Sequence, residues 1–257
     1  MAKDLNKKPY DEATLTKLEI FEQYLIAWLP VFIHTPHTSK AMICDFCAGS
    51  GYDSIGIDGS PIRIVKRIDN YRDQIFQNDI HIDILLNDVK IKKYRELENA
   101  VAESFQEESW HGKVTLSCHN EDFQQLFRQQ YERLKQQPNL LFIDQSGVRQ
   151  VTNEIFQMLI GLNKTDFLFF ISSSAIKRFA GTAEFSTLVV IFLFFLAGNQ
   201  KGEIFLNSYT LLLRYLSRTF KNSSLSGLGV FFLTLIPIRF RLPSMKIFIE
   251  SCWTTTR

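Results

Sequence analysis

Hydrophobic and polar positions form two kinds of pattern over the first 172 residues, a helical period and short apolar runs. In 17–32, "KLEIFEQYLIAWLPVF", apolar residues recur every three to four positions, which predicts an amphipathic helix that Pro30 should end or kink. Further helices are predicted over 60–77, 90–108, 121–137 and 151–162. Apolar-rich runs predict buried strands at 41–47, 139–144 and 166–172 and further strands at 80–86 and 113–118.

The regular alternation of these strands and helices indicates an α/β fold. Strands that are apolar throughout are typical of a sheet covered on both faces, so we expect a Rossmann-like, doubly wound and mainly parallel sheet. The expected organisation has an N-terminal helical segment at 1–40 and a Rossmann-like domain at 41–184. Residues 185–257 form an atypical tail. Ligands of such sheets bind at the carboxyl ends of the strands.

The segment 43–54, "ICDFCAGSGYDS", runs from the first predicted strand into a glycine turn. Gly49 and Gly51 can adopt positive φ and allow a ligand close to the backbone, although small glycine turns are also common for purely structural reasons. Asp45 would stand at the strand end, where a carboxylate can bind turn amides or an ammonium group. A redox or metal role for Cys44 and Cys47 does not fit, because Cys44 lies inside the strand and no second ligand pair follows.

Polar residues recur at the ends of the next predicted strands. Asn87 and Asp88 end the second strand, the tripeptide 120–122 follows the third, and Asp144 ends the fourth. Any one of them could be a helix cap, and Asp122 in particular suits that role. Because the carboxyl ends of parallel strands share one edge of the sheet, the four groups together favour a ligand cleft there. No metal site is expected.

Several of these segments together resemble a known family. The stretches "KLEIFEQYLIAWLPVF", "ICDFCAGSGYDSIGIDGSP", "NEDFQQLF", "LLFIDQSGV" and "TDFLFFISSSAIKRF" lie in this order between Lys17 and Phe179. They resemble the class I S-adenosylmethionine-dependent methyltransferases and, more narrowly, the three-Cys-motif partner protein (TcmP) family. The resemblance implies a cofactor loop formed by Asp45, Ala48, Gly49 and Gly51. It implies that Asp88 (or Asn87 in a shifted register) binds the ribose and that Asp122 and Phe123 flank the adenine. It also makes Asp144 the catalytic candidate.

The resemblance also implies a function, with alternatives. It implies a methyltransferase that uses S-adenosylmethionine, with an unknown acceptor, and a three-cysteine-motif protein as partner. The first alternative is a non-catalytic partner protein with a degenerate methyltransferase fold. The second is an inactive, truncated or frameshifted family member. Gln145 stands where related families often have proline after the acid, which leaves the methyl acceptor open.

The tail at 185–257 differs in composition from the rest of the chain. It holds eight Lys and Arg against two Glu, has no Asp, and contains ten of the 23 Phe. It can be a membrane anchor, a set of strands that completes the sheet (the run "LGVFFLTLIPI" would suit one), or the product of a shifted reading frame near residue 184. We expect the sheet to be incomplete at this edge, with the strand at 166–172 apolar and unpaired there.

Overall composition narrows the remaining options only a little. The chain has a net charge of +2 and 46% hydrophobic residues, which is ordinary for a globular protein and gives no general attraction to nucleic acid, without excluding it. Four cysteines are too few for a disulfide framework, and no apolar signal segment follows Met1. The apolar run at 187–198 is shorter than the roughly 20 residues of a membrane-spanning helix. We therefore expect a cytoplasmic protein with no stable membrane span.

Overall fold

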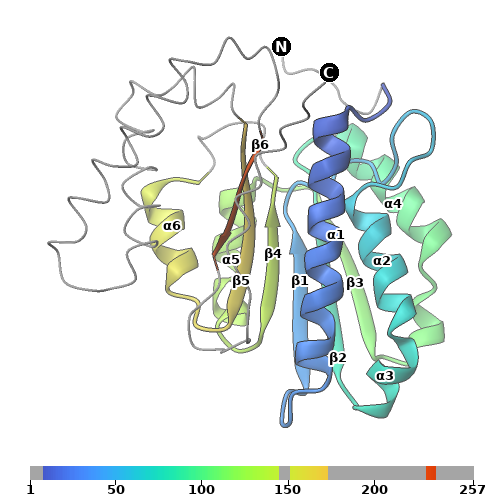
Figure 1. The fold of residues 1–257 in the computed structure, drawn as a ribbon, viewed down its shortest axis with the longest axis vertical. Helices are drawn as coiled ribbons and strands as arrows, with labels where there is room; N and C mark the ends of the chain where they lie inside the picture. The colour runs from blue at the N-terminus through green and yellow to red at the C-terminus, as the bar shows by residue number, and fades with distance from the viewer. Residues whose placement is uncertain (1–7, 145–150, 173–229, 236–257) are drawn as a thin grey trace, which may run out of the picture.

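The computed structural model describes residues 8–144, 151–172 and 230–235, which form one α/β unit (Figure 1). Its elements, in chain order, are α1 (Glu12–Ile33), β1 (Lys40–Asp45), α2 (Ser60–Asn70), α3 (Arg72–Gln77), β2 (His81–Asn87), α4 (Ile91–Ser104), η2 (Glu107–Trp110), β3 (Val114–His119), α5 (Phe123–Leu134), β4 (Asn139–Ile143), α6 (Asn153–Ile160), β5 (Thr165–Ser172) and β6 (Val230–Leu235). All five strands and all five helical segments predicted from the apolar pattern are present, with boundaries that differ by a few residues.

The sheet has the strand order β3-β2-β1-β4-β5-β6, and its first five strands are parallel. Ile43, in the central strand β1, lies opposite Ile84 of β2 on one side and Leu140 of β4 on the other. The strand order reverses between β1 and β4, so the carboxyl end of β1 is the switch point at which such sheets bind ligands. The predicted parallel, Rossmann-like sheet is confirmed.

Two hydrophobic cores cover the two faces of the sheet. Ala41 and Ile43 of β1 pack into a core shared with α1, α2, α3 and α4. Met42 and Cys44 point to the opposite face and pack into a second core with α5 and α6. Successive residues of a strand point to opposite faces, so a strand buried on both sides must be apolar at nearly every position. This requirement explains the continuous apolar runs in the sequence.

The first helix extends further than the sequence suggested. Pro30 lies inside α1, which continues to Ile33, so Pro30 does not end the helix. Proline has no N–H to donate to the carbonyl four residues earlier, which is that of Ile26. The hydroxyl group of Tyr71 donates a hydrogen bond to this carbonyl at 3.2 Å. Tyr71 also separates α2 from α3, within the segment predicted as one helix.

The outer edge of β5 is paired, so the expectation that this strand would be unpaired was wrong. β6 pairs antiparallel with β5, with Phe232 opposite Phe170, and lies within the "LGVFFLTLIPI" run of the tail. An antiparallel strand of the tail therefore covers the edge that the sequence analysis left open. The rest of the tail, including the apolar run at 187–198, lies outside the described residues. No helix in the described ranges is both long and apolar enough to cross a membrane.

Candidate functional site

The turn after β1 is built around two glycines in the left-handed region. Gly49 has φ 73° and Gly51 has φ 90°, where side chains with a Cβ are disfavoured. A Cβ on Gly51 would also lie 2.7 Å from the Cβ of Ala100, so α4 packs directly against the turn. The amide of Ala48 donates to the carbonyl of Asn87 at 2.8 Å, which joins the turn to the end of β2. The predicted cofactor loop is therefore a tight turn at the switch point.

Asp45 is the last residue of β1 and is fully buried beneath this turn. Its Oδ1 accepts a hydrogen bond from the amide of Cys47 at 3.1 Å, whereas its Oδ2 has no hydrogen-bond partner among the described residues. Burial raises the pKa of Asp45 to about 7, and the nearby Asp144 and Asp88 carboxylates add to the rise. The Ser60 hydroxyl and the Cys47 amide lower the pKa but do not offset the effect of burial.

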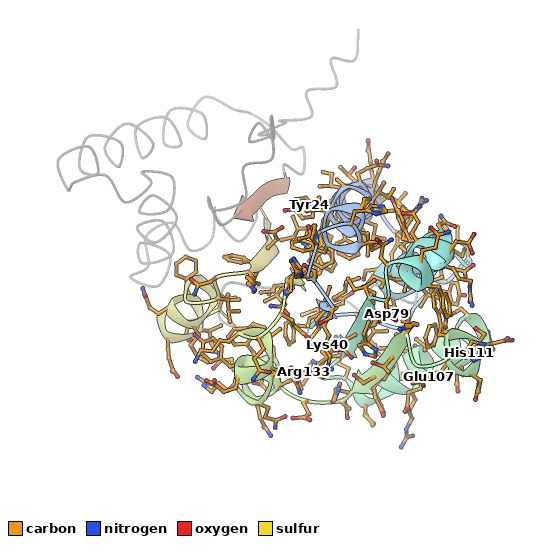
Figure 2. The ribbon with its side chains drawn as sticks, turned by 90° about the horizontal axis from the view of Figure 1, so that it is seen from below. Tyr24, Lys40, Asp79, Glu107, His111 and Arg133 are labelled. Carbon is orange, nitrogen blue, oxygen red and sulfur yellow. The ribbon has the colours of Figure 1, made fainter. Side chains whose placement is uncertain are left out.

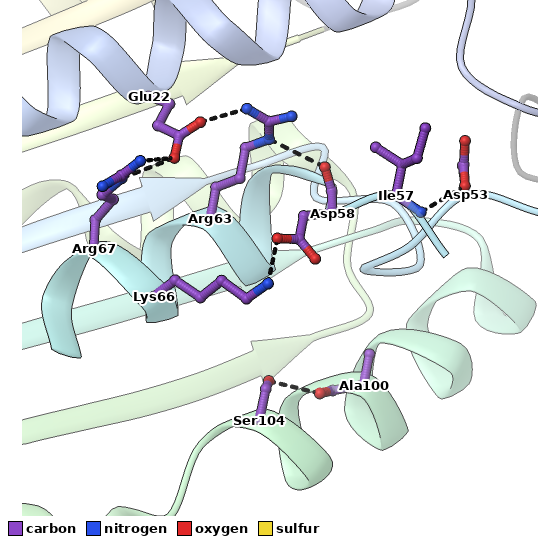
Figure 3. A network of polar contacts seen from close by, with 9 residues as sticks. All are labelled: Glu22, Asp53, Ile57, Asp58, Arg63, Lys66, Arg67, Ala100 and Ser104. Carbon is purple, nitrogen blue, oxygen red and sulfur yellow. Dashed lines mark hydrogen bonds and ion pairs between the residues drawn. The ribbon is translucent and has the colours of Figure 1, made fainter. Parts of the chain in front are cut away.

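Asp53 holds the rest of the loop, a role that the sequence analysis missed. Its Oδ1 accepts hydrogen bonds from the amides of Ile55 and Ile57 at 2.9 and 2.8 Å (the latter bond is drawn in Figure 3), and its Oδ2 accepts one from Tyr10 at 2.9 Å. Burial opposes the charge of Asp53, but these backbone donors outweigh it and lower the pKa of the carboxyl group. Three donors on one carboxylate identify Asp53 as an organiser of the loop rather than as a ligand group.

A cluster of ion pairs fixes α2, the helix that follows the loop, against α1. Glu22 of α1 pairs with Arg63 and, at 2.6 Å, with Arg67 of α2, as Figure 3 shows. Arg63 also donates to the carbonyl of Asp58 at 3.1 Å, and Lys66 pairs with the Asp58 carboxylate at 2.5 Å. Because Asp58 belongs to the loop itself, this network connects the loop to both helices.

The end of β2 contributes two buried polar residues with different roles. Asp88 accepts hydrogen bonds from the amide of Gly49 at 3.2 Å and from that of Lys90 at 2.8 Å. Asn87 donates to the carbonyls of Phe46 and Glu121, both at 3.1 Å, and accepts from the amide of Glu121 at 3.0 Å. Asn87 therefore connects three strand ends, while Asp88 directly supports the glycine turn.

Asp122 and Phe123, which the resemblance places beside an adenine, instead cap a helix and pack in the core. Asp122 is the N-cap of α5, and its Oδ1 accepts from the amides of Gln124 and Gln125 at 2.9 and 3.3 Å. Phe123 is buried and makes an edge-on contact with Phe46, with 5.1 Å between ring centroids. Helix capping, the alternative considered for Asp122, is the role that these contacts display.

Asp144 follows β4 and faces the first helix. It forms an ion pair with Lys17 of α1. From the same helix, Tyr24 donates a hydrogen bond to Asp166 of β5 at 3.1 Å, and burial raises the pKa of Asp166 to about 6. The segment 145–150, which includes Gln145, lies outside the described residues. Lys17 was missed from the sequence because 127 positions separate it from its partner.

The cysteines of the turn do not form a redox pair. Cys44 is fully buried inside β1, and burial raises the pKa of its thiol far above the ordinary value. Burial, followed by the charge of Asp45, likewise raises the pKa of Cys47. Reactive thiols need a lowered pKa, so neither group suits thiol chemistry. Within the described ranges, no cluster of three His, Cys, Asp or Glu side chains is arranged to hold a metal ion.

The site therefore brings most of the predicted residues to one edge. Asp45, the glycine turn, Asp88 and Asp144 meet at the carboxyl ends of β1, β2 and β4, whereas Asp122 and Phe123 serve α5 and its core. A search of protein-family models finds no match to this chain, and a search of curated proteins finds no relative. Function must therefore be argued from the geometry.

Proposed function

We propose that the chain binds S-adenosylmethionine at the carboxyl edge of its sheet and acts as a methyltransferase, with an unidentified acceptor. The observation that carries this proposal is the Asp45 carboxylate. It is fully buried at the switch point, and its Oδ2 has no hydrogen-bond partner in the described part of the chain. A buried carboxylate is costly unless a partner compensates it, and the ammonium group of an amino-acid ligand would do so.

Other residues of the edge fit the same cofactor. A turn with Gly49 and Gly51 at positive φ lets a ligand approach the backbone closely. Asp88 uses one oxygen for each of two amides, and a carboxylate oxygen has a second lone pair that can accept from a ribose hydroxyl. Phe123 fits less well as an adenine neighbour, because its ring is already packed in the core.

The proposed chemistry requires little acid–base catalysis from the protein. When bound, the cofactor supplies a methyl group that its sulfonium centre already activates. The contribution of the chain would be to hold the cofactor through Asp45 and Asp88, to align the acceptor and to exclude water. Asp144, with Lys17 beside it, would line the acceptor side and orient the incoming group.

One observation favours a second candidate, a non-catalytic partner of a three-cysteine-motif protein. Asp144, the candidate catalytic carboxylate, is already engaged by Lys17. A fold kept for association would retain such a pair as a structural contact between α1 and β4. If the folded protein fails to bind the cofactor but binds a purified three-cysteine-motif protein, the second candidate replaces the first.

Calorimetric titration of the full chain with S-adenosylmethionine tests the proposal. The test variant is Asp45→Asn, and the matched control is Asp73→Asn, which removes the same charge from an exposed position on α3. We expect saturable binding by the wild type and the control, and an affinity at least about tenfold lower in Asp45→Asn. Equal affinity in all three proteins, or no binding by the folded wild type, would refute it.

A further inference from the structure

A polar groove of about 500 Å³ lies at the amino ends of the strands, opposite the candidate methyltransferase site. Figure 2 looks at this end of the molecule and labels Lys40 and Arg133. The groove is bounded by the loop before β1, the starts of β2 and β5, the second residue of β3 and the segment between α5 and β4. Its lining residues are His37, Thr38, Ser39, Lys40, His81, Asp83, Thr115, Arg133, Gln136, Gln137, Pro138 and Lys164.

The charges of the groove are mostly positive. Lys40, Arg133 and Lys164 line the groove together with one carboxylate, that of Asp83. Apart from Pro138 the remaining lining residues carry hydroxyl or amide groups, which donate hydrogen bonds. Such a lining suits an anion with several oxygen acceptors and does not suit an apolar ligand.

The single carboxylate is already compensated within the fold. Asp83 is buried, and it pairs with Arg133 at 2.6 Å, accepts from the Thr115 hydroxyl at 2.7 Å and lies 3.0 Å from Nε2 of His81. Burial opposes its charge, yet these partners together lower the pKa of Asp83. Asp83 therefore stays ionised and holds Arg133 in place, while Lys40 and Lys164, both exposed, add two positive charges to the groove.

A further donor points to a missing acceptor at the same place. Gln137 lines the groove and is buried, and its Nε2 has no hydrogen-bond partner among the described residues. A buried amide N–H without an acceptor costs about 1–3 kcal/mol, so an oxygen that accepts from it would be favourable.

We propose that this groove binds the phosphate groups of a small phosphorylated ligand. Phosphate oxygens accept several charge-assisted hydrogen bonds at once, which matches two lysines, an ordered arginine and the surrounding hydroxyl and amide donors. A nucleic-acid backbone is the less suitable anion, because it requires a basic surface that extends over many phosphates, whereas these cations converge on one groove. The proposal does not depend on the methyltransferase function, since the groove is at the other end of the strands.

Pyrophosphate is the probe for this site, titrated into the full chain by calorimetry at low salt and neutral pH. The test variant is the double substitution Lys40→Gln/Lys164→Gln. Its matched control is Lys92→Gln/Arg95→Gln, which removes the same charge from two exposed positions of α4. Arg133 is left intact, because its removal would leave Asp83 buried without its ion pair and could destabilise the fold.

We expect one-site binding by the wild type and the α4 control, and a loss of at least about tenfold in affinity in the groove variant. Absence of saturable binding by the wild type would overturn the proposal, and so would an equal loss in both double variants, which would indicate a general charge effect. Asp45→Asn should bind pyrophosphate like the wild type. If that substitution strengthened binding, the removal of a repelling carboxylate would locate the phosphate at the carboxyl edge, and the groove assignment would be wrong.

Discussion

Replacing Asp45 with asparagine should stabilise the ligand-free protein at pH 8. The carboxylate is fully buried, and burial raises its pKa from an ordinary 3.8 to about 7. A group with a higher pKa in the folded state binds its proton more tightly there, so folding becomes less favourable as the pH rises through this window. The free-energy cost of ionising Asp45 in the folded state is absent below pH 3.8 and fully developed above pH 7.

The size of the effect follows from the pKa difference. At 1.36 kcal/mol for each pH unit, the full cost of ionising Asp45 in the folded state is roughly 4 kcal/mol. An asparagine amide at the same buried position carries its own cost of about 1–3 kcal/mol for polar groups without partners. That amide cost does not depend on pH, whereas at pH 5 most of the carboxylate cost has disappeared. The advantage of Asp45→Asn should therefore fall by about 2–3 kcal/mol between pH 8 and pH 5.

Urea unfolding of the wild type and the variant at pH 8 and pH 5 measures this difference. Asp73→Asn is the control, because Asp73 is exposed and its replacement should leave the difference between the two pH values unchanged. If the stability gap between wild type and Asp45→Asn is the same at both pH values, Asp45 is not a buried, strained carboxylate. The argument that it needs a cationic ligand would then fail as well.

Three further predictions follow from the same structure. An ammonium-bearing ligand binds the ionised form of Asp45, so the affinity for S-adenosylmethionine should fall by up to about tenfold per pH unit below pH 7; a flat calorimetric profile between pH 5.5 and 7.5 would contradict this. Gly51→Ala should weaken the same binding and lower the melting temperature, because its Cβ would meet that of Ala100 at 2.7 Å in a positive-φ turn; unchanged values would show that the turn tolerates a side chain. Deleting residues 185–257 removes β6 and exposes β5, so it should reduce the soluble yield relative to the full chain; a higher yield would indicate that the tail itself drives aggregation.

The apolar pattern predicted the fold well because the sheet is buried on both faces. In β2 and β4 almost every residue is inaccessible, so each strand had to be mostly apolar and stands out between amphipathic helices. The buried polar exceptions, Asp83, Asn87 and Asn139, all make hydrogen bonds within the fold. The pattern was less informative where a polar contact from elsewhere decides the outcome. Pro30 remains within α1 while Tyr71, from the junction of α2 and α3, donates to the carbonyl that the proline leaves unpaired.

The sequence predicted only those residues of the candidate site that lie at the ends of strands. Asp45 and Asp88 come together because parallel strands end at one edge, and this can be read from the chain. Asp122 could not be assigned in the same way, since a helix cap and a ligand group have the same local sequence. Lys17 meets Asp144 through tertiary packing alone.

The amino edge carried a signal that strand-end reasoning did not use. Lys40 and His81 begin two of the strands, and Lys164 directly precedes a third, so parallel pairing collects them at the edge opposite the carboxylates. A cation before a strand is common on surfaces, and each one alone suggests nothing about binding. Only the groove, the buried Asp83 and the ordered Arg133 turn this regularity into a candidate site.

The distance between the two proposed sites determines how they can influence each other. β1 has six residues, so the two edges are about 20 Å apart at roughly 3.3 Å per residue. That separation exceeds twice the screening length of about 8 Å between exposed charges at physiological salt, and the cations of the groove neutralise much of the bound charge, so pyrophosphate should hardly change the ionisation of Asp45. If pyrophosphate nevertheless changes the affinity for S-adenosylmethionine, and the change persists at high salt, the coupling must be mechanical. It would then run through the rigid elements that reach both ends of the sheet, of which β1 is the most direct.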